Sequence, residues 1–174
     1  MIKNAVFCIA KDRTHAETIV EGLKTAGYPS TDISVLLPES SGTKEFAHEQ
    51  NTKMPEGATT GVVAGMSTGA VLGWLAGIGT LAIPGVGPFI AAGPIMAALG
   101  GAAVGGATGG ILGALVGMGI PEIEAKHYDG RISSGNTLIS VQTAGTEQEN
   151  SVRQIFESLG GEDIKSTKET LATN

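Results

Sequence analysis

The chain has 174 residues, a formal net charge of -6 and an isoelectric point near 5.0. This acidic balance argues against a nucleic-acid partner, because no basic stripe is present to neutralise phosphates. The single cysteine, Cys8, excludes an internal disulfide framework and a paired-cysteine metal or redox site. The N-terminal apolar run stops at Lys11, which is too early for a secretory signal, so we place both termini in a cytosol.

Charge is distributed unevenly along the sequence. No Asp, Glu, Lys, Arg or His occurs between Glu56 and Glu122, and most of the 27 glycines lie in this interval. The pattern divides the chain into four parts, which are residues 1–38, a polar linker 39–56, an apolar insertion 57–119 and a second polar part 120–174.

The first polar part predicts a strand, a helix and a second strand. Residues 5–10 form a short apolar run of strand length. Thr14 and Glu17 have the spacing of a capping box, and an apolar face follows at helical spacing until Gly27. Residues 32–37 then predict the second strand.

The second polar part repeats this order. An extra helix begins at Pro121 and ends near Gly135, and residues 137–141 predict a strand. Thr146 and Glu149 form another capping box before a helix and a last strand at 163–165. Two such βαβ units predict an α+β fold, a ferredoxin-like four-stranded antiparallel sheet with helices on one face, interrupted by the insertion.

Glycine recurs every fourth residue through the insertion, in two series with one gap, at Ala97. Such spacing costs up to about 1 kcal/mol per glycine in an isolated helix, but it leaves a smooth face against which a second helix packs closely. We therefore predict a glycine zipper that drives helix packing and oligomerisation. Its residues are Gly57, Gly61, Gly65, Gly69, Gly73, Gly77, Gly93, Gly101, Gly105, Gly109, Gly113 and Gly117.

The prolines at 84, 88 and 94 divide the insertion into two expected helices, 57–83 and 94–119. Each would be about 40 Å long at 1.5 Å per residue, which exceeds the hydrocarbon core of about 30 Å. The sequence thus favours a transmembrane helical hairpin with both polar parts on one side. Single helices of this composition are marginal in a bilayer, so self-association is expected, either in a membrane or as the apolar interior of a soluble oligomer.

Two short motifs resemble catalytic or nucleotide-binding signatures, but their context does not fit. Ser67 lies in a Gly-x-Ser-x-Gly pattern without the preceding strand that a nucleophile elbow needs. Residues 85–87 lack the third glycine of a dinucleotide loop and are interpreted as a turn.

The cysteine and the histidines also suggest no chemistry. Cys8 is expected to be a buried small hydrophobe in its strand. His15, His48 and His127 are expected to be solvated and show no metal-ligand spacing. No catalytic, cofactor-binding or metal site is predicted.

Residues 119–131 and 135–141, together with the opening strand and the Ala16-Glu17 helix, resemble bacterial general stress proteins of the heat-induced YflT-like and low-temperature-induced type. This resemblance implies a stress-response protein without established catalysis. A second resemblance, to the membrane subunit of quinol-oxidising alternative complexes, implies instead a structural subunit of a respiratory or transport assembly.

From these observations we expect a non-enzymatic, self-assembling protein at the cytoplasmic membrane. Its expected partners are further copies of itself, as a homo-oligomer, and the lipid bilayer, without cofactor, nucleic acid or small-molecule substrate. The alternatives are the complex subunit, a cytoplasmic oligomer with a buried apolar core, and a ligand-binding or enzymatic domain on a membrane tether.

Overall fold

The computed structural model describes residues 3–38, 79–83, 87–93 and 111–169. In chain order the elements are β1 (Lys3–Ala10), α1 (Arg13–Thr25), the 3-10 helix η1 (Ser30–Asp32), β2 (Ile33–Pro38), β3 (Gly79–Ile83), β4 (Gly87–Ala92), α5 (Ile111–Gly117), α6 (Glu122–Ser133), β5 (Thr137–Thr143), α7 (Thr146–Ser158) and β6 (Glu162–Glu169). The fold is α+β, as the sequence predicts.

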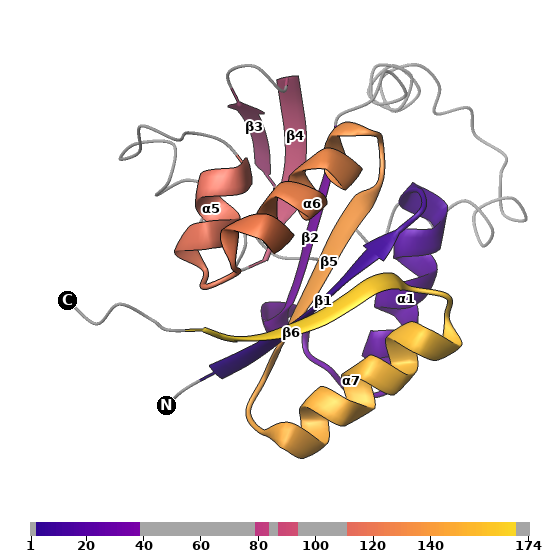
Figure 1. Ribbon diagram of the computed structural model, residues 1–174. Coiled ribbons are helices and arrows are strands. Elements are labelled where there is room, and N and C mark those ends of the chain that lie inside the picture. The colour runs from indigo at the N-terminus through magenta and orange to yellow at the C-terminus, as the bar shows by residue number, and fades with distance from the viewer. Residues whose placement is uncertain (1–2, 39–78, 84–86, 94–110, 170–174) are drawn as a thin grey trace, which may run out of the picture.

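The strands form one sheet in the order β3-β4-β2-β5-β1-β6, and every neighbouring pair is antiparallel. The units β1-α1-β2 and β5-α7-β6 are interleaved, because β5 lies between β1 and β2 while β1 lies between β5 and β6 (Figure 1). The sheet has six strands instead of the expected four, since the insertion contributes β3 and β4.

Alternation along the strands creates two separate cores. In β1, the even-numbered residues Val6, Cys8 and Ala10 face one side, and the odd-numbered residues Ala5, Phe7 and Ile9 face the other. The first side packs under α1 and α7, whose buried faces are the ones expected from helical spacing. Their buried apolar residues are Ala16, Ile19, Val20, Leu23, Val152 and Phe156.

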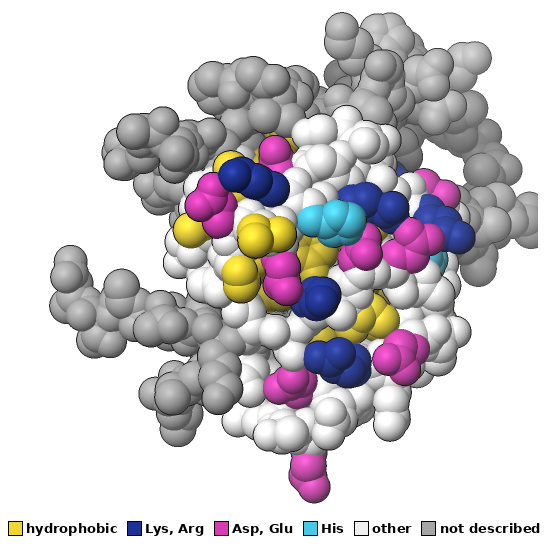
Figure 2. All heavy atoms as spheres, in the orientation of Figure 1, with side chains coloured by type: hydrophobic (Ala, Val, Ile, Leu, Met, Phe, Trp, Pro, Cys, Tyr) yellow, Lys and Arg dark blue, Asp and Glu magenta, His cyan; other side chains and the backbone are white. Residues whose placement is uncertain are grey.

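Helices α5 and α6 cover the second face of the sheet, so the expectation of helices on one face is wrong. Ile111, Ala114 and Leu115 of α5 are buried there with Tyr128 and Ile132 of α6. The strand residues Phe7, Leu36, Phe89 and Leu138 complete this second core. On the outside of this layer, charged side chains alternate with hydrophobic ones (Figure 2).

The prediction of a helix over residues 57–83 is wrong for 79–83, the part that the structure describes. These residues form β3, which pairs with β4 in the register Gly79↔Ala91 to Ile83↔Gly87. The four-residue glycine spacing ends at Gly77, and Thr80 and Ile83 are β-branched residues that suit a strand. The pattern that predicts a helix therefore stops just before the strand begins.

The second glycine series is also interrupted. Gly93 does not belong to a helix, because it follows β4 with φ +79°, and a Cβ there would lie 2.2 Å from the carbonyl oxygen of Ile33. Gly113 and Gly117 lie in α5, as a helix over 94–119 requires. Within the ranges that the structure describes, no helix is long and apolar enough to cross a bilayer.

The helix starts differ from the predicted capping boxes. Asp12 caps α1 by accepting a hydrogen bond from the His15 amide at 2.8 Å, while Glu17 pairs with Arg13. Helix α7 begins after Gly145 and has no side-chain cap. The predicted helix ends are confirmed at Gly27 and Gly135. At Gly27, with φ +93°, the amide of Tyr28 donates to the carbonyl of Leu23.

Candidate functional site

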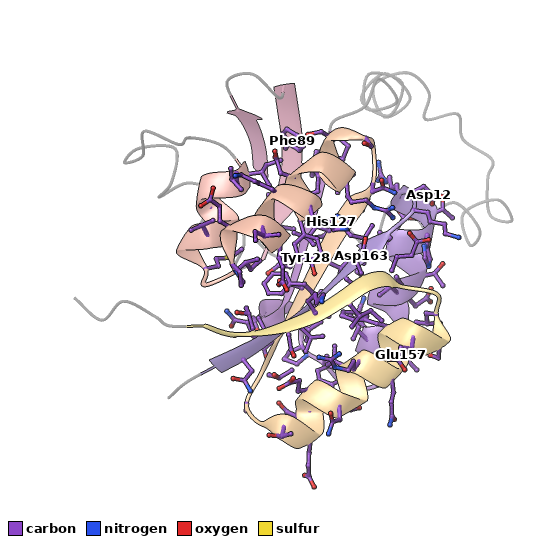
Figure 3. All side chains as sticks on the ribbon, viewed as in Figure 1. Asp12, Phe89, His127, Tyr128, Glu157 and Asp163 are labelled. Carbon is purple, nitrogen blue, oxygen red and sulfur yellow. The ribbon has the colours of Figure 1, made fainter. Side chains whose placement is uncertain are left out.

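The densest polar cluster in the described chain joins α6 to the beginning of β6. It begins with an irregularity in the pairing of β6, since Ile9 lies opposite Glu162 whereas Phe7 lies opposite Lys165. The extra residue produces a β-bulge, and Asp163 within it has φ 51°. Left-handed backbone is uncommon outside glycine and is best tolerated by Asp and Asn. This conformation brings Asp163 next to His127 and Tyr128 of α6 (Figure 3).

Asp163 contacts α6 through both its main chain and its side chain. Its carbonyl oxygen accepts a hydrogen bond from the Tyr128 hydroxyl at 2.8 Å, and its Oδ2 lies 2.9 Å from His127 Nε2. Arg131 Nε lies 3.6 Å from the same carboxylate, an ion-pair distance that is too long for a hydrogen bond. Three residues from one face of α6 therefore converge on one residue of β6.

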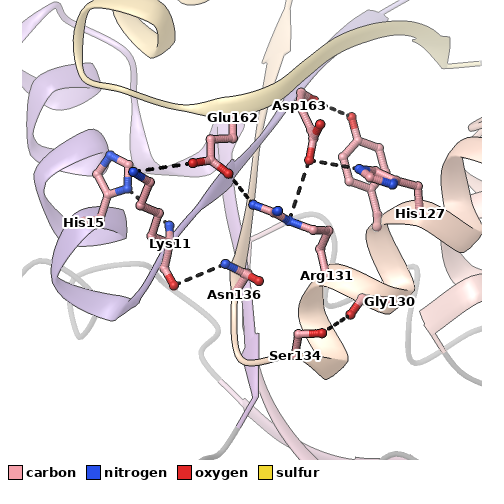
Figure 4. Close-up of polar contacts among 10 residues, drawn as sticks. Lys11, His15, His127, Gly130, Arg131, Ser134, Asn136, Glu162 and Asp163 are labelled. Carbon is pink, nitrogen blue, oxygen red and sulfur yellow. Dashed lines mark hydrogen bonds and ion pairs between the residues drawn. The ribbon is translucent and has the colours of Figure 1, made fainter.

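A second carboxylate continues the cluster toward β1. Glu162 accepts a hydrogen bond from Arg131 Nη2, and its other oxygen lies 3.5 Å from Lys11 Nζ (Figure 4). The side chain of Asn136 donates to the carbonyl oxygen of Lys11 at 3.2 Å, which links the start of β5 to the same corner. We call Lys11, His127, Arg131, Glu162 and Asp163 the α6–β6 network.

The electrostatics of the network follow from these contacts. The hydrogen bond from Arg131 lowers the pKa of Glu162, and the charges of Arg131 and Lys11 act in the same direction. Burial raises the pKa of Tyr128, which keeps its hydroxyl as a hydrogen-bond donor to Asp163. Two basic side chains, Lys11 and Arg131, stand against two carboxylates, so the network is close to electrically balanced. Its geometry suits a clamp between α6 and β6.

His15 and His127 make more polar contacts within the fold than the sequence suggests. His15 bridges two helices, because its Nδ1 accepts from the Lys11 amide at 3.2 Å and its Nε2 lies 2.7 Å from the carbonyl oxygen of Leu159. His127 binds Asp163, 36 positions away. No local pattern could reveal the contacts of His15 with Leu159 and of His127 with Asp163, since both depend on how distant elements pack. His48 lies outside the described residues.

The cysteine, the two short motifs and the zipper glycines discussed from the sequence lie in different parts of the chain. Cys8 is buried in β1, as expected, and burial raises the pKa of its thiol. Gly87 begins β4, whereas Ser67, Gly85 and Val86 lie outside the described residues. Of the zipper positions, Gly93, Gly113 and Gly117 are described. The remaining ones lie outside, namely Gly57, Gly61, Gly65, Gly69, Gly73, Gly77, Gly101, Gly105 and Gly109.

A small polar hollow of about 170 Å³ lies where η1 meets the end of β5 and the start of α7. Its lining consists of Asp32, Gln142, Thr143, Ala144 and Gln148. The Gln148 side chain is already used inside this corner, since its Oε1 accepts from the Ala144 amide at 2.8 Å. In the described part of the chain, no group of three or more His, Cys, Asp or Glu could hold a metal ion.

The outer face of α5 is the second feature of interest. Ile111, Ala114 and Leu115 face the core, whereas Val116 and Gly117 face outward. A Cβ placed on Gly117 would meet no atom within 4 Å among the described residues. Nearby, at the start of α6, Ile123 is 84% exposed.

Comparisons with protein-family models, with curated proteins and with solved structures gave no match.

Proposed function

We propose that this protein is a non-enzymatic assembly protein. In this proposal a ferredoxin-like α+β core carries a glycine-zipper insertion that drives self-association and attachment to a bilayer. The strand order β6-β1-β5-β2, with α1 and α7 on one face, supports the ferredoxin-like assignment of the core. The hairpin β3–β4 then extends the edge at β2.

The observation that carries the proposal is the orientation of α5. The last two members of the second glycine series, Gly113 and Gly117, are one helical turn apart. Neither belongs to the buried side of the helix, which consists of Ile111, Ala114 and Leu115. Among the described residues, no atom lies within 4 Å of a Cβ placed on Gly117. In this proposal the glycine side of α5 packs against another helix through its small residues.

The β3–β4 hairpin supports the proposal because the described residues next to the two glycine series, Gly79 and Ala91, lie opposite each other. The first series ends at Gly77, just before β3, and the second begins at Gly93, just after β4. Because Gly79 lies opposite Ala91, the chain enters and leaves the hairpin at the same end. A helix formed by the first glycine-rich segment would therefore end beside the point where a helix formed by the second segment begins.

Attachment to a bilayer rests on composition. The glycine-rich segments 57–78 and 94–110, which flank the β3–β4 hairpin, contain no charged residue, so their transfer from water carries no cost of burying a charge. The resemblance to bacterial general stress proteins supports a role in a stress response. On this proposal both termini lie on the cytosolic side, with the α+β core.

The test compares Gly117→Leu with Gly130→Leu in the full chain. Both glycines lie in helices, and among the described residues a Cβ at either position would meet nothing within 4 Å. Only Gly117 belongs to the glycine series. Leucine at position 117 should block close helix packing and reduce the native size, measured by sedimentation velocity in one detergent. Leucine at position 130 should leave the size unchanged.

Membrane attachment is measured separately by flotation of the same variants with lipid vesicles. Leucine is more apolar than glycine, so Gly117→Leu should float at least as well as the unmodified chain. An unchanged native size for Gly117→Leu, and also for the central substitutions Gly69→Leu and Gly109→Leu, would refute the assembly role of the glycine face.

A further inference from the structure

The two edges of the sheet differ in their charge. The edge strand β6 contains Glu162, Asp163, Lys165, Lys168 and Glu169. The opposite edge strand, β3, has the sequence Gly-Thr-Leu-Ala-Ile without a charged residue. Charged residues commonly protect a sheet edge from pairing with another strand. Only the β6 edge has this protection, and among the described residues β3 pairs only with β4 (Figure 1).

A proline in β4 determines which groups of β3 point outward. Ala82 lies opposite Pro88, which has no amide hydrogen to donate. In an antiparallel pair, hydrogen-bonded positions alternate with non-hydrogen-bonded ones, so Pro88 fits at a non-hydrogen-bonded position. Residues 79, 81 and 83 then bond to β4. The N–H and C=O groups of Thr80 and Ala82 are directed to the outer edge.

We propose that the outer edge of β3 pairs antiparallel with β3 of a second copy of this chain, about a two-fold axis at Leu81. The outward groups are self-complementary under this symmetry. Thr80 lies opposite Ala82 of the second copy, and Ala82 lies opposite its Thr80, so each pair exchanges two main-chain hydrogen bonds. The sheet continues from one copy into the other, as in other cases of strand addition.

A second copy fits this edge better than the chain's own neighbouring segment does. Residues 57–77, which precede β3, have glycine at every fourth position, a spacing that suits a helix and not the two-residue alternation of a strand. Because β3 is uncharged, symmetric pairing places no like charges opposite each other. This interface is separate from the glycine face of α5 and does not depend on the function proposed above.

The pairing register is tested by cysteine substitution in the full chain. Leu81 is the position that meets itself across the two-fold axis, in a non-hydrogen-bonded pair where opposed residues are close enough for a disulfide. Under mild oxidation, Leu81→Cys should form several-fold more covalent dimer than Thr80→Cys or Ala82→Cys. Cys8 is buried in β1, so the unmodified chain serves as the background control. Equal cross-linking at all three positions, or none at position 81, would overturn the proposal.

A second experiment tests the main-chain groups themselves. Ala82→Pro removes an outward amide while sparing the inner ladder, and Ala82→Val keeps that amide. The proline variant should lose the edge-paired dimer in sedimentation velocity, whereas the valine variant should retain it. Hydrogen exchange at Thr80 and Ala82 should slow as protein concentration rises. Protection that is independent of concentration would mean that the chain covers its own edge, which contradicts the proposal.

The two proposals fail in different ways. If only the glycine face mediates assembly, Gly117→Leu reduces the native size and Leu81→Cys gives no covalent dimer. If only the β3 edge mediates it, Leu81→Cys cross-links and Gly117→Leu changes nothing.

Discussion

The side chain of Glu162 links β6 to α6 through its hydrogen bond from Arg131. Its partner Arg131 is also within ion-pair distance of Asp163, so the guanidinium lies between the two carboxylates (Figure 4). The side chains of Arg131 and Glu162 are both partly exposed, and ion pairs in such positions are screened by water. The clamp therefore acts through the sum of several modest contacts, which also fix the bulge at Asp163.

The pKa of Glu162 makes the clamp sensitive to acid. The hydrogen bond from Arg131 lowers this pKa in the folded chain below its value of about 4.3 in the unfolded chain. The stabilising contribution of Glu162 is therefore fully present above that value and is lost as the pH falls toward the folded pKa. Glu162→Gln should lower the free energy of unfolding most near neutral pH and least below about pH 4. Urea denaturation between pH 3 and 7 measures this difference.

Asp129 provides a control of the opposite sign. Burial raises the pKa of its carboxyl, so at neutral pH the folded chain holds an anion that would be better solvated in the unfolded chain. Asp129→Asn should therefore be more stable than the unmodified chain near neutral pH, and this advantage should shrink in acid. If both substitutions changed the pH profile in the same direction, general surface charge and not these specific contacts would explain the effect.

At the scale of elements, the two glycine-series members Gly93 and Gly117 have different roles. Gly93 has a positive φ and lies against the backbone of Ile33, whereas a Cβ on Gly117 would meet no described atom within 4 Å. The two glycines fit the same four-residue spacing in the sequence. In the structure, however, the backbone at Gly93 requires glycine, whereas the helix at Gly117 does not.

This contrast predicts opposite effects of alanine. Gly93→Ala should destabilise the chain by more than about 1 kcal/mol, because left-handed backbone disfavours alanine and its Cβ would clash with the Ile33 carbonyl. Gly117→Ala should be neutral or stabilising by up to about 1 kcal/mol, since alanine is the better helix former. Thermal unfolding of the two variants measures the difference. Similar losses at both positions would show that Gly117 is also packed against the chain.

The elements that could be predicted from sequence are those whose pattern is local. The apolar run of β1 and the buried face of α1 can be recognised from the sequence alone, and so can the end of α1 at Gly27. The β3–β4 hairpin does not follow from the sequence, because the glycine periodicity on both sides of it indicates helices. The α6–β6 network could not be predicted, because His127 and Asp163 meet only after α6 has packed beside β6.

At the scale of the whole molecule, the α+β core depends on the insertion more than the composition of the insertion suggests. The sequence implies that residues 1–38 joined to 119–174 would fold alone, since both βαβ units lie outside the insertion. Yet β4 pairs with β2, and Phe89, Ile111 and Leu115 are each 1% exposed in the second core. The second face of the sheet is therefore built partly from the insertion.

Two shortened chains test this dependence. Burying an aliphatic or aromatic side chain contributes about 1.5–3 kcal/mol, so loss of Phe89, Ile111 and Leu115 together should cost roughly 5–9 kcal/mol. This cost is comparable to the whole stability of a typical domain, about 5–15 kcal/mol. A chain with 39–118 replaced by a short linker should thus lose its cooperative thermal transition in circular dichroism. A chain with only 39–78 replaced, by a flexible linker long enough to run from the end of β2 to the start of β3, should keep it. A cooperative transition in the first chain would show instead that α6 alone suffices to cover the second face.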